Sequence, residues 1–392
     1  MTLKVAIVGS GKIADGHVEE IQKLGRLARV VATCDIELLM AEQLARRFGI
    51  ASYYDQFDEL LERERPDVVH ITTPPGPHLA LAKRAMQAGC HVYVEKPLTP
   101  THQQSVELID TATRLGRQLT VGYTYFFDPP ALQMRELIEA GELGDPIHVE
   151  SVFGYNLAGP FGAALLGDAD HWVHRLPGKL FQNNIDHLLN KLVEFIPDDA
   201  PRIHAHAYLA RQERFGDVRD DMEDELRLMV TGERVTAYGT FSSHARPAAH
   251  YCKVFGTKNT LTVDYVMRTV TLDATPKLPS AIGRLLPAFD QALQFAQQAG
   301  KNVRQFARSE FQFFAGLNQL IRRFYESIQA QAEPPISYRD ILRISSMLDQ
   351  TWQQLETARS QRRGQLSHPT APNDGATAQR SAGQAHGAQG AE

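Results

Sequence analysis

The chain has 392 residues, of which 43% are hydrophobic and 22% charged, a composition typical of globular proteins and unlike that of disordered or collagen-like chains. Such a length favours two domains over one. The formal net charge of −5 argues against a nucleic-acid partner, and no apolar run is long enough to span a membrane.

Short β-branched segments alternate with helical stretches over the first 122 residues. The strand-like segments are Val5–Val8, Val30–Thr33, Val68–Thr72, His91–Val94 and Leu119–Val121. Near-continuous apolar strands of this kind are buried on both faces, and the helices between them supply right-handed crossovers. The pattern predicts an α/β, doubly wound parallel sheet of the Rossmann type as a domain over residues 1–122.

After Gly122 the strands become longer and carry polar interruptions. They are expected at Pro146–Phe153, Ile203–Leu209, Glu225–Val230, Arg234–Ser243, Tyr251–Phe255 and Thr260–Leu272. Residues 256–259 (Gly-Thr-Lys-Asn) resemble a hairpin joint, and one helix is expected over Gln182–Phe195. This predicts a second, α+β domain with a largely antiparallel sheet over residues 123–358.

Residues 278–331 have a helical pattern, which Pro287 and Gly300 are expected to break. Basic and aromatic residues mix there. The pattern favours an amphipathic helix packed on its own sheet or on a subunit partner over a helix on a membrane surface. Residues 359–392 are rich in Gly, Ala, Gln and Ser, so this tail cannot offset its ordering entropy by burial and is predicted to be disordered.

The cysteines indicate a reducing compartment. Cys34, Cys90 and Cys252 are odd in number, far apart and without a C-x-x-C pair, so we expect reduced core thiols. A strand-like run begins at Lys4, which leaves no room for a signal peptide, and a cytoplasmic location is expected.

The first strand runs directly into a glycine pattern of the form G-x-G-x-x-A. Gly9 permits a tight turn, Gly11 lets the backbone approach a pyrophosphate, and Ala14 allows close helix packing. The helix start, with Lys12 and Ile13, offers N–H groups to phosphates. A glycine pattern alone also fits an ordinary strand-to-helix turn, but its place after the first strand favours a dinucleotide site.

An acidic residue ends the second strand. Asp35 can accept hydrogen bonds from both hydroxyls of an adenosine ribose, whereas a 2′-phosphate would be repelled by Asp35 and Glu37. NAD is therefore the expected cofactor rather than NADP. The alternative is that Asp35 is a solvated residue at a strand end.

Two further motifs follow the third and fourth long strands. One comprises Thr72, Thr73, Pro74 and His78, and the other is Glu95-Lys96-Pro97. With the glycine loop, they resemble the glucose-fructose oxidoreductase, inositol dehydrogenase and rhizopine catabolism (Gfo/Idh/MocA) family. The resemblance implies cofactor contacts from both motifs, a nicotinamide over the carboxyl ends of the strands, and Lys96 beside the reacting carbon, with a Lys96–Pro97 bond that can be cis. Lys96 would stabilise a developing alkoxide.

The segment ending in His187 resembles the family's G-G-x-x-x-D-x-G-x-H stretch, which implies that His187 is the catalytic base. Helical spacing places Asn183, His187, Asn190 and Glu194 on one polar stripe. Asn183, the third predicted catalytic residue, stands where the family usually has aspartate. Without that carboxylate, His187 is expected to be a weaker base but more often deprotonated near neutral pH.

The predicted substrate contacts are Tyr123, Tyr125, Trp172 and His174. The family usually has a polar pair where this chain has Thr124 and Phe126, so the substrate pocket has diverged. Residues 168–174 contain Asp and His residues that could be taken for metal ligands, but nothing nearby completes a coordination shell, and no metal is expected.

These residues predict hydride transfer between NAD and a secondary hydroxyl or ketone of a sugar, sugar nucleotide or cyclitol, without a nucleic-acid or membrane partner. The family resemblance further implies a homodimer or homotetramer that forms through the open face of the second-domain sheet. The alternative function is a dinucleotide-binding sensor or assembly protein without turnover, because Asn183, Thr124 and Phe126 depart from the family pattern.

Overall fold

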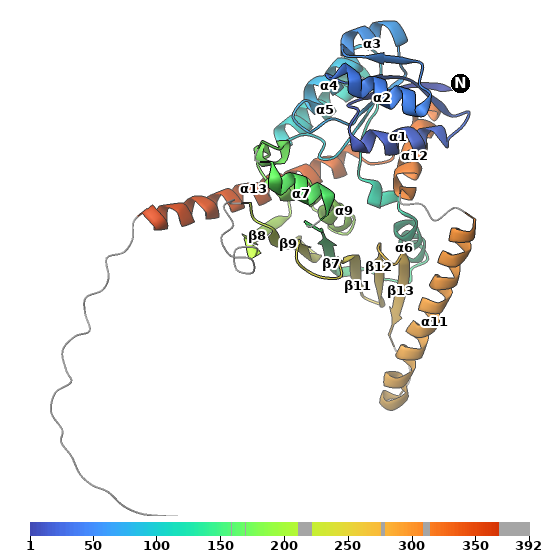
Figure 1. The fold of residues 1–392 in the computed structure, drawn as a ribbon. Coiled ribbons are helices and arrows are strands. Elements are labelled where there is room, and N and C mark those ends of the chain that lie inside the picture. Colours follow the sequence, from blue (N-terminus) through green and yellow to red (C-terminus); the bar gives the residue numbers. More distant parts are fainter. Residues whose placement is uncertain (158, 169, 211–221, 276–278, 309–313, 368–392) are drawn as a thin grey trace, which may run out of the picture. The chain divides into compact units, whose positions relative to one another are not determined.

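The computed structural model describes all residues except 158, 169, 211–221, 276–278, 309–313 and 368–392 (Figure 1). Residues Met1–Leu355 form one compact unit, and the chain from Glu356 onward forms a second. Among the helices of the described residues, none is long and apolar enough to cross a membrane.

The first 121 residues build a parallel six-stranded sheet in the order β3-β2-β1-β4-β5-β6. This confirms the predicted Rossmann arrangement. Residues 5–7 of β1 are fully buried, and α1 packs Ala14, Val18 and Ile21 inward at helical spacing. The elements are β1 (Leu3–Val8), α1 (Lys12–Gln22), β2 (Ala28–Cys34), α2 (Leu38–Phe48), β3 (Ser52–Tyr54), α3 (Phe57–Glu64), β4 (Val68–Ile71), α4 (His78–Gln87), β5 (His91–Val94), α5 (His102–Leu115) and β6 (Leu119–Val121).

The second sheet has seven strands in the order β13-β12-β11-β7-β10-β9-β8. All neighbouring strands within this sheet are antiparallel except β7 and β10, which run parallel to each other. The prediction of a largely antiparallel sheet is therefore confirmed. Helix α9 (Asp186–Val193) covers one face of this sheet between it and the first domain (Figure 1). The strands are β7 (Pro146–Gly154), β8 (Arg202–Tyr208), β9 (Glu225–Thr231), β10 (Thr236–Ser242), β11 (His250–Gly256), β12 (Asn259–Asp264) and β13 (Thr269–Ala274).

Two predicted elements of the second domain are wrong in detail. The segment Thr260–Leu272 is not one strand, because residues 265–268 turn the chain between β12 and β13. The helix expected over Gln182–Phe195 is split into α8 (Lys179–Gln182) and α9 by a turn at residues 183–185. The remaining short helices are η1 (Thr124–Phe127), α6 (Pro129–Glu139), α7 (Pro160–Gly167) and η2 (Trp172–Arg175).

The C-terminal helices also differ from expectation. Helix α11 (Ser280–Ala307) continues through Pro287 and Gly300, although a proline inside a helix removes one backbone hydrogen bond and crowds the preceding turn. Helix α12 (Ala315–Ala330) packs against α1 of the first domain. Helix α13 (Tyr338–Ser367) extends into the tail that was predicted to be disordered from residue 359, and residues 368–392 lie outside the described part of the chain.

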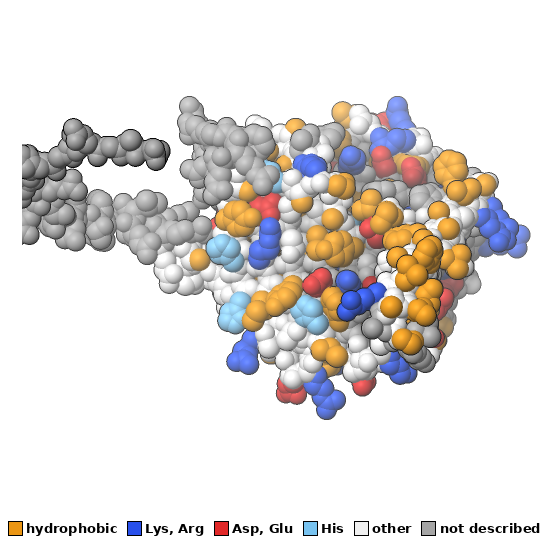
Figure 2. Space-filling view, turned by 90° about the horizontal axis from the view of Figure 1, so that it is seen from below, with side chains coloured by type: hydrophobic (Ala, Val, Ile, Leu, Met, Phe, Trp, Pro, Cys, Tyr) orange, Lys and Arg blue, Asp and Glu red, His pale blue; other side chains and the backbone are white. Residues whose placement is uncertain are grey.

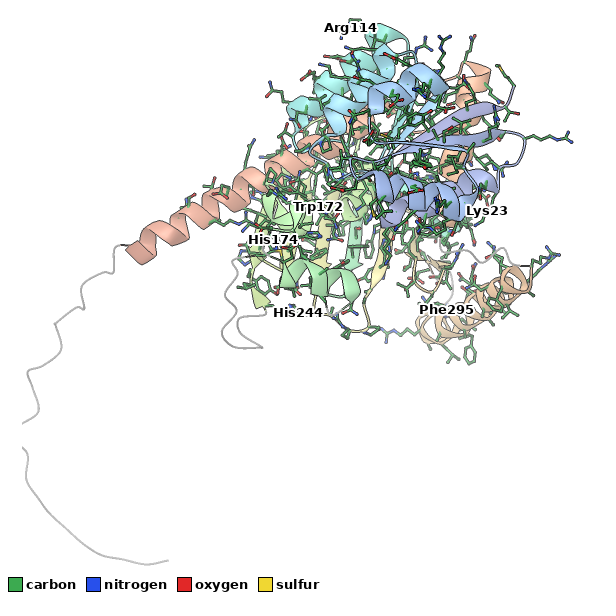
Figure 3. The ribbon with its side chains drawn as sticks, turned by 45° about the horizontal axis from the view of Figure 1, so that its top comes forward. Lys23, Arg114, Trp172, His174, His244 and Phe295 are labelled. Carbon is green, nitrogen blue, oxygen red and sulfur yellow. The ribbon has the colours of Figure 1, made fainter. Side chains whose placement is uncertain are left out.

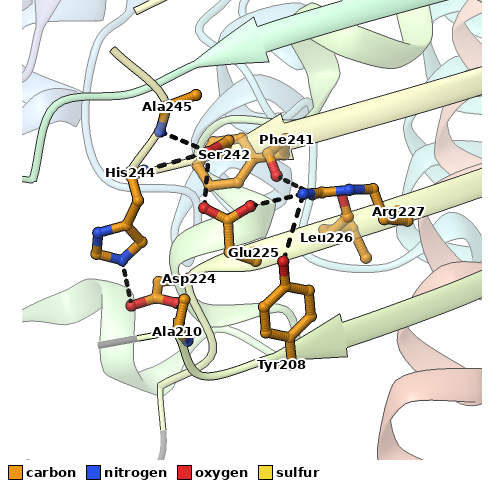
Figure 4. A network of polar contacts seen from close by, with 10 residues as sticks. All are labelled: Tyr208, Ala210, Asp224, Glu225, Leu226, Arg227, Phe241, Ser242, His244 and Ala245. Carbon is orange, nitrogen blue, oxygen red and sulfur yellow. Dashed lines mark hydrogen bonds and ion pairs between the residues drawn. The ribbon is translucent and has the colours of Figure 1, made fainter. Parts of the chain in front are cut away.

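Buried carboxylates near the end of the second sheet have partners (Figure 4). Asp224 accepts hydrogen bonds from the backbone N–H of Ala210 at 2.8 Å and contacts His244 Nε2 at 2.9 Å. Glu225 pairs with Arg227 at 2.9 Å and accepts a hydrogen bond from Ser242 at 2.7 Å. The three cysteines are buried and free, as predicted.

Candidate active site

The loop after β1 has a conformation that requires glycine at its first position. Gly9 has a φ of +95°, and a Cβ there would lie 2.7 Å from the backbone nitrogen of Thr73. The Thr72 hydroxyl donates to the Gly9 carbonyl at 2.6 Å. Thr72 and Thr73 therefore brace the glycine loop against the end of β4.

Asp35 lies against the same loop, as its position at the end of β2 predicts. One carboxylate oxygen accepts the Ser10 N–H at 2.6 Å, and the other accepts the Glu37 N–H at 3.0 Å. The side chain is half-buried. Its negative charge is thus fixed beside the start of α1.

These residues fit an adenine dinucleotide. Apart from its neighbours along the chain, no atom of the described residues lies within 4 Å of where a Cβ on Gly11 would be, so the start of α1 is open to a ligand. Two buried hydroxyls near this opening, Ser10 Oγ and Thr73 Oγ1, have no hydrogen-bond partner among the described residues. Buried polar groups normally find partners, so a bound phosphate fits this cradle.

Lys96 joins the two domains. Its Nζ donates to the backbone carbonyl of Asn183 at 2.8 Å and lies 3.5 Å from Asn183 Oδ1. Gln182 Nε2 donates to the Pro100 carbonyl at 2.8 Å, which gives a second link between the same segments. The Lys96–Pro97 bond is cis. The structure thus brings together Lys96 and Asn183, two of the predicted catalytic residues.

His187 lies in the first turn of α9 and is half-buried. Its ring meets Tyr125 edge-on at 4.8 Å and Phe153 at 5.2 Å between centroids. Burial, together with the charges of Lys96 and Lys191, holds the pKa of His187 well below its usual value. This direction agrees with the expectation of a more often deprotonated imidazole, and its causes are burial and two lysines.

Asp186 is a candidate site residue that the sequence reasoning missed. The side chain is fully buried, and neither carboxylate oxygen has a hydrogen-bond partner among the described residues. Burial raises the pKa of Asp186 to about 7, Lys96 opposes that rise, and Glu95 adds to it. The adjacent pair Asp186-His187 was the available signal, but its importance depends on the nearby charge of Lys96, which only folding brings there.

Lys191 lies one helical turn after His187 and is also buried. Its Nζ has no hydrogen-bond partner in the described part of the chain and lies 5.2–5.8 Å from the ring centroids of Tyr125, Phe153 and Tyr265. Burial lowers the pKa of Lys191 to about 7. The side of α9 that bears His187 therefore faces an aromatic cage rather than water.

The remaining predicted residues have several environments. Both ring nitrogens of His78 contact backbone carbonyls. Nε2 lies 2.9 Å from the Thr73 carbonyl, and Nδ1 lies 3.1 Å from the carbonyls of Pro97 and Leu98. His78 therefore links the loop after β4 to the loop after β5. Tyr123 is fully buried, whereas Lys12 and Pro74 are exposed and Ile13 is half-buried.

Trp172 and His174 lie on η2 in the second domain (Figure 3). Trp172 is half-buried and 5.5 Å from the ring of His171, and His174 Nε2 contacts the Leu165 carbonyl at 2.9 Å. These contacts hold η2 against neighbouring residues of the second domain. A role in substrate binding stays a prediction for both residues.

Two family models match consecutive parts of the chain. Residues 3–123 match the model described as oxidoreductase family, NAD-binding Rossmann fold. Residues 131–262 match the Gfo/Idh/MocA C-terminal domain.

Among curated relatives, D-glucoside 3-dehydrogenase of Escherichia coli K12 is 36% identical over 143 residues, which cover 36% of this chain and 41% of that protein. Inositol 2-dehydrogenase of Salmonella paratyphi B is 30% identical over 151 residues, 38% of this chain and 45% of that protein. The matches thus span less than half of each relative. A structure of the WlbA dehydrogenase from Bordetella pertussis in complex with NADH and UDP-GlcNAcA covers 91% of this chain and 96% of its own, with a TM-score of 0.73 and 16% identity, which shows the same fold.

Proposed function

This chain belongs to the Gfo/Idh/MocA oxidoreductase family, and on that premise we propose that it is an NAD-dependent dehydrogenase acting on a secondary hydroxyl or ketone of a sugar, sugar nucleotide or cyclitol. The observation that carries the proposal is the 2.8 Å hydrogen bond from Lys96 to Asn183, which brings the first-domain ammonium group to the turn that precedes α9, the helix that bears His187. The names of the relatives, D-glucoside 3-dehydrogenase and inositol 2-dehydrogenase, support the substrate class.

The cofactor would be held by the glycine loop and Asp35. The open start of α1 at Gly11 would receive the pyrophosphate, and Asp35 would accept hydrogen bonds from the adenosine ribose. Bound NAD supplies the acceptor or donor of the hydride. The negative charge of Asp35 disfavours the 2′-phosphate of NADP.

Lys96 and the side chains around it would stabilise the substrate oxygen and accept the proton of the substrate hydroxyl. Oxidation of a carbinol transfers its C–H hydride to the nicotinamide and its hydroxyl proton to a base. The Lys96 ammonium would stabilise negative charge on the substrate oxygen. His187, whose pKa is lowered by burial and by two lysines, is unprotonated near neutral pH and can accept the proton. Tyr125, in edge contact with His187, would lie next to the substrate.

The test is a screen of the purified protein with NAD⁺ against sugars, sugar nucleotides, uronic acids and inositols, followed by the near-ultraviolet absorbance of reduced nicotinamide. Formation of NADH with one class, dependent on Lys96, supports the proposal. The second candidate is a dinucleotide-binding protein without turnover, which Asn183 favours because a neutral amide stands where the family usually has a carboxylate. NAD binding without NADH formation across the whole screen would favour that candidate.

We also propose a cytoplasmic homodimer or homotetramer that assembles through the open face of the second sheet. On this face His148 meets the rings of Tyr238 at 4.7 Å and Phe255 at 5.8 Å. Tyr238 and its neighbour across the strands, Met229, are 52% and 42% exposed. In Figure 2, which views the molecule from below Figure 1, apolar side chains gather in clusters between charged ones. Apolar clusters on a surface are typical of subunit contacts.

A further inference from the structure

A buried chain of hydrogen bonds leads from α12 to the carboxylate next to Lys96. The Tyr325 hydroxyl lies 2.8 Å from His70 Nε2. His70 Nδ1 lies 2.8 Å from His17 Nδ1, and His17 Nε2 lies 2.9 Å from Glu95 Oε1. Tyr325, His70 and His17 are all fully buried. Four elements therefore contribute to one line of polar contacts: α12, β4, α1 and the end of β5.

With both imidazoles neutral, the chemistry of the rings gives this line one direction. His17 Nε2 then donates to the Glu95 carboxylate, and His17 Nδ1 accepts. His70 must donate from Nδ1 and accept at Nε2, where the Tyr325 hydroxyl donates. Burial holds the pKa of His70 well below its usual value, which agrees with a neutral ring. Every donor in the line then points toward Glu95.

Glu95 shares its surroundings with a second carboxyl group. Burial raises the pKa of Glu95, but the hydrogen bond from His17 and the charge of Lys96 outweigh that rise, so the net pKa is lowered. Asp186 has no such partner among the described residues, and its carboxyl has a pKa of about 7. Two carboxyl groups beside one ammonium are thus pushed toward opposite protonation states, as in sites where one carboxylate is charged and the other holds a proton.

We propose that Tyr325, His70 and His17 form a positioning network of fixed hydrogen-bond direction that holds Glu95 as the charged carboxylate and leaves Asp186 as the carboxyl group that carries a proton. The proposal rests on the proposed function in that it gives the dehydrogenase a second proton-holding group beside His187. The titratable and charged groups around Asp186 are Lys96, Glu95, Tyr123 and His187, and those around Glu95 are His17, His78, Tyr93, Lys96 and Asp186.

The direction of the network is measured by nitrogen-15 NMR of the histidine rings in the protein without NAD. We expect His17 as the Nε2–H tautomer and His70 as the Nδ1–H tautomer. Tyr325→Phe keeps the ring but removes the hydroxyl, so His70 should lose its fixed tautomer. Detection of His70 as the Nε2–H tautomer in the wild type would reverse the direction of the line and overturn the proposal.

The consequence for Asp186 is measured by carbon-13 NMR of its carboxyl group across pH. Glu95→Gln removes a neighbouring negative charge, so the pKa of Asp186 should fall by about one pH unit, and Tyr325→Phe should lower it by less. Tyr93→Phe is the matched control, because the Tyr93 ring stacks on His70 at 4.6 Å while its hydroxyl has no hydrogen-bond partner among the described residues.

An unchanged Asp186 titration in Glu95→Gln would overturn the proposal, as would an equal shift in Tyr93→Phe. Neither NMR measurement uses cofactor or substrate. If the network is found but no NAD binds, the proposed function fails alone. If NAD binds and is reduced but the tautomers or the titration disagree, the network proposal fails alone.

Discussion

Asp186 and Lys191 are two ionisable side chains that the fold buries beside His187 without a hydrogen-bond partner among the described residues. Burying an unpaired ionisable group costs stability, and it shifts the pKa of the group in the direction that favours the neutral form. Both pKa values lie near 7, where a small change in surroundings changes the charge. Such groups concentrate at functional sites.

Asp186→Asn should stabilise the protein at alkaline pH. The folded pKa of about 7 lies above the unfolded value of about 3.9, so wild-type stability falls as pH rises between these values and the cost is complete above 7. The variant should therefore gain roughly 2–4 kcal/mol in unfolding free energy at pH 8 and nothing below pH 4. Urea denaturation at several pH values measures this.

Asp224→Asn is the matched control, since Asp224 is equally buried but paired with His244 and the Ala210 N–H. This variant should lose stability at pH 8. Equal responses of the two variants would contradict the view that Asp186 is unpaired.

Lys96→Met should remove turnover but not cofactor binding. The methionine keeps the length of the side chain and loses the ammonium, so stabilisation of the substrate oxygen is lost and kcat should fall by about 100- to 1000-fold. NADH formation with the substrate found in the screen measures kcat, and calorimetry measures NAD affinity. Lys83→Met, which breaks only a surface pair with Glu107, should leave both unchanged. An active Lys96→Met enzyme would remove Lys96 from the mechanism.

Among the elements, the unit formed by β1, the glycine loop and α1 has one glycine that the fold requires and another that ligand binding requires. Gly9 is required by the fold, because a Cβ would meet the Thr73 backbone, whereas the space around Gly11 is open to a ligand. Gly9→Ala should lower the unfolding free energy by about 1–3 kcal/mol. Gly11→Ala should leave stability unchanged and weaken NAD binding, since its Cβ would enter the phosphate cradle.

Thermal unfolding and NAD calorimetry of these two variants are the measurements. Loss of stability in Gly11→Ala, or undiminished NAD affinity in it, would contradict the assignment of its open space to the pyrophosphate.

The periodicity of apolar residues predicted most helices and strands, and it failed where the bounds of an element depend on contacts with distant residues. The alternation of apolar strands and helices correctly indicated the first sheet, but β3 has only three residues and no apolar run, so it was missed. The break at residues 183–185 interrupts a helical pattern that a sequence window reads as continuous. Pro287 had the opposite effect, because local propensity predicted a break that the long helix α11 tolerates.

The site was predictable in part for the same reason. Gly9, Asp35 and Lys96 each follow a strand, and the carboxyl ends of parallel strands meet at one edge, so chain order was sufficient. The line from Tyr325 to Glu95 joins residues up to 255 positions apart, and no spacing rule relates them. Asp186 gains its importance only from these neighbours.

For the molecule as a whole, exposed apolar side chains on the surface predict that several copies of the chain assemble. Apolar side chains are exposed on the open sheet face and along α11, where Leu285, Phe289, Val303 and Phe306 are each at least 60% exposed, and Phe295 projects from the same helix (Figure 3). Surfaces of this kind are costly in water unless a partner covers them.

Tyr238→Lys should therefore shift the protein toward a single chain of 43.7 kDa, measured by light scattering, because it places a charge in the proposed contact. Tyr53→Lys is the matched control, since Tyr53 is exposed on β3 at the edge of the first sheet. A wild-type protein that is already monomeric would contradict the proposed contact.

The central claim is that an adenine dinucleotide binds the loop between β1 and α1 with Asp35 at its ribose. Calorimetric titration with NAD⁺ and NADP⁺ in parallel tests it most directly. We expect saturable heat with NAD⁺ and binding of NADP⁺ that is weaker by about tenfold or more, and Asp35→Ser should narrow this difference in affinity. No heat with either nucleotide, or tighter binding of NADP⁺, would contradict it.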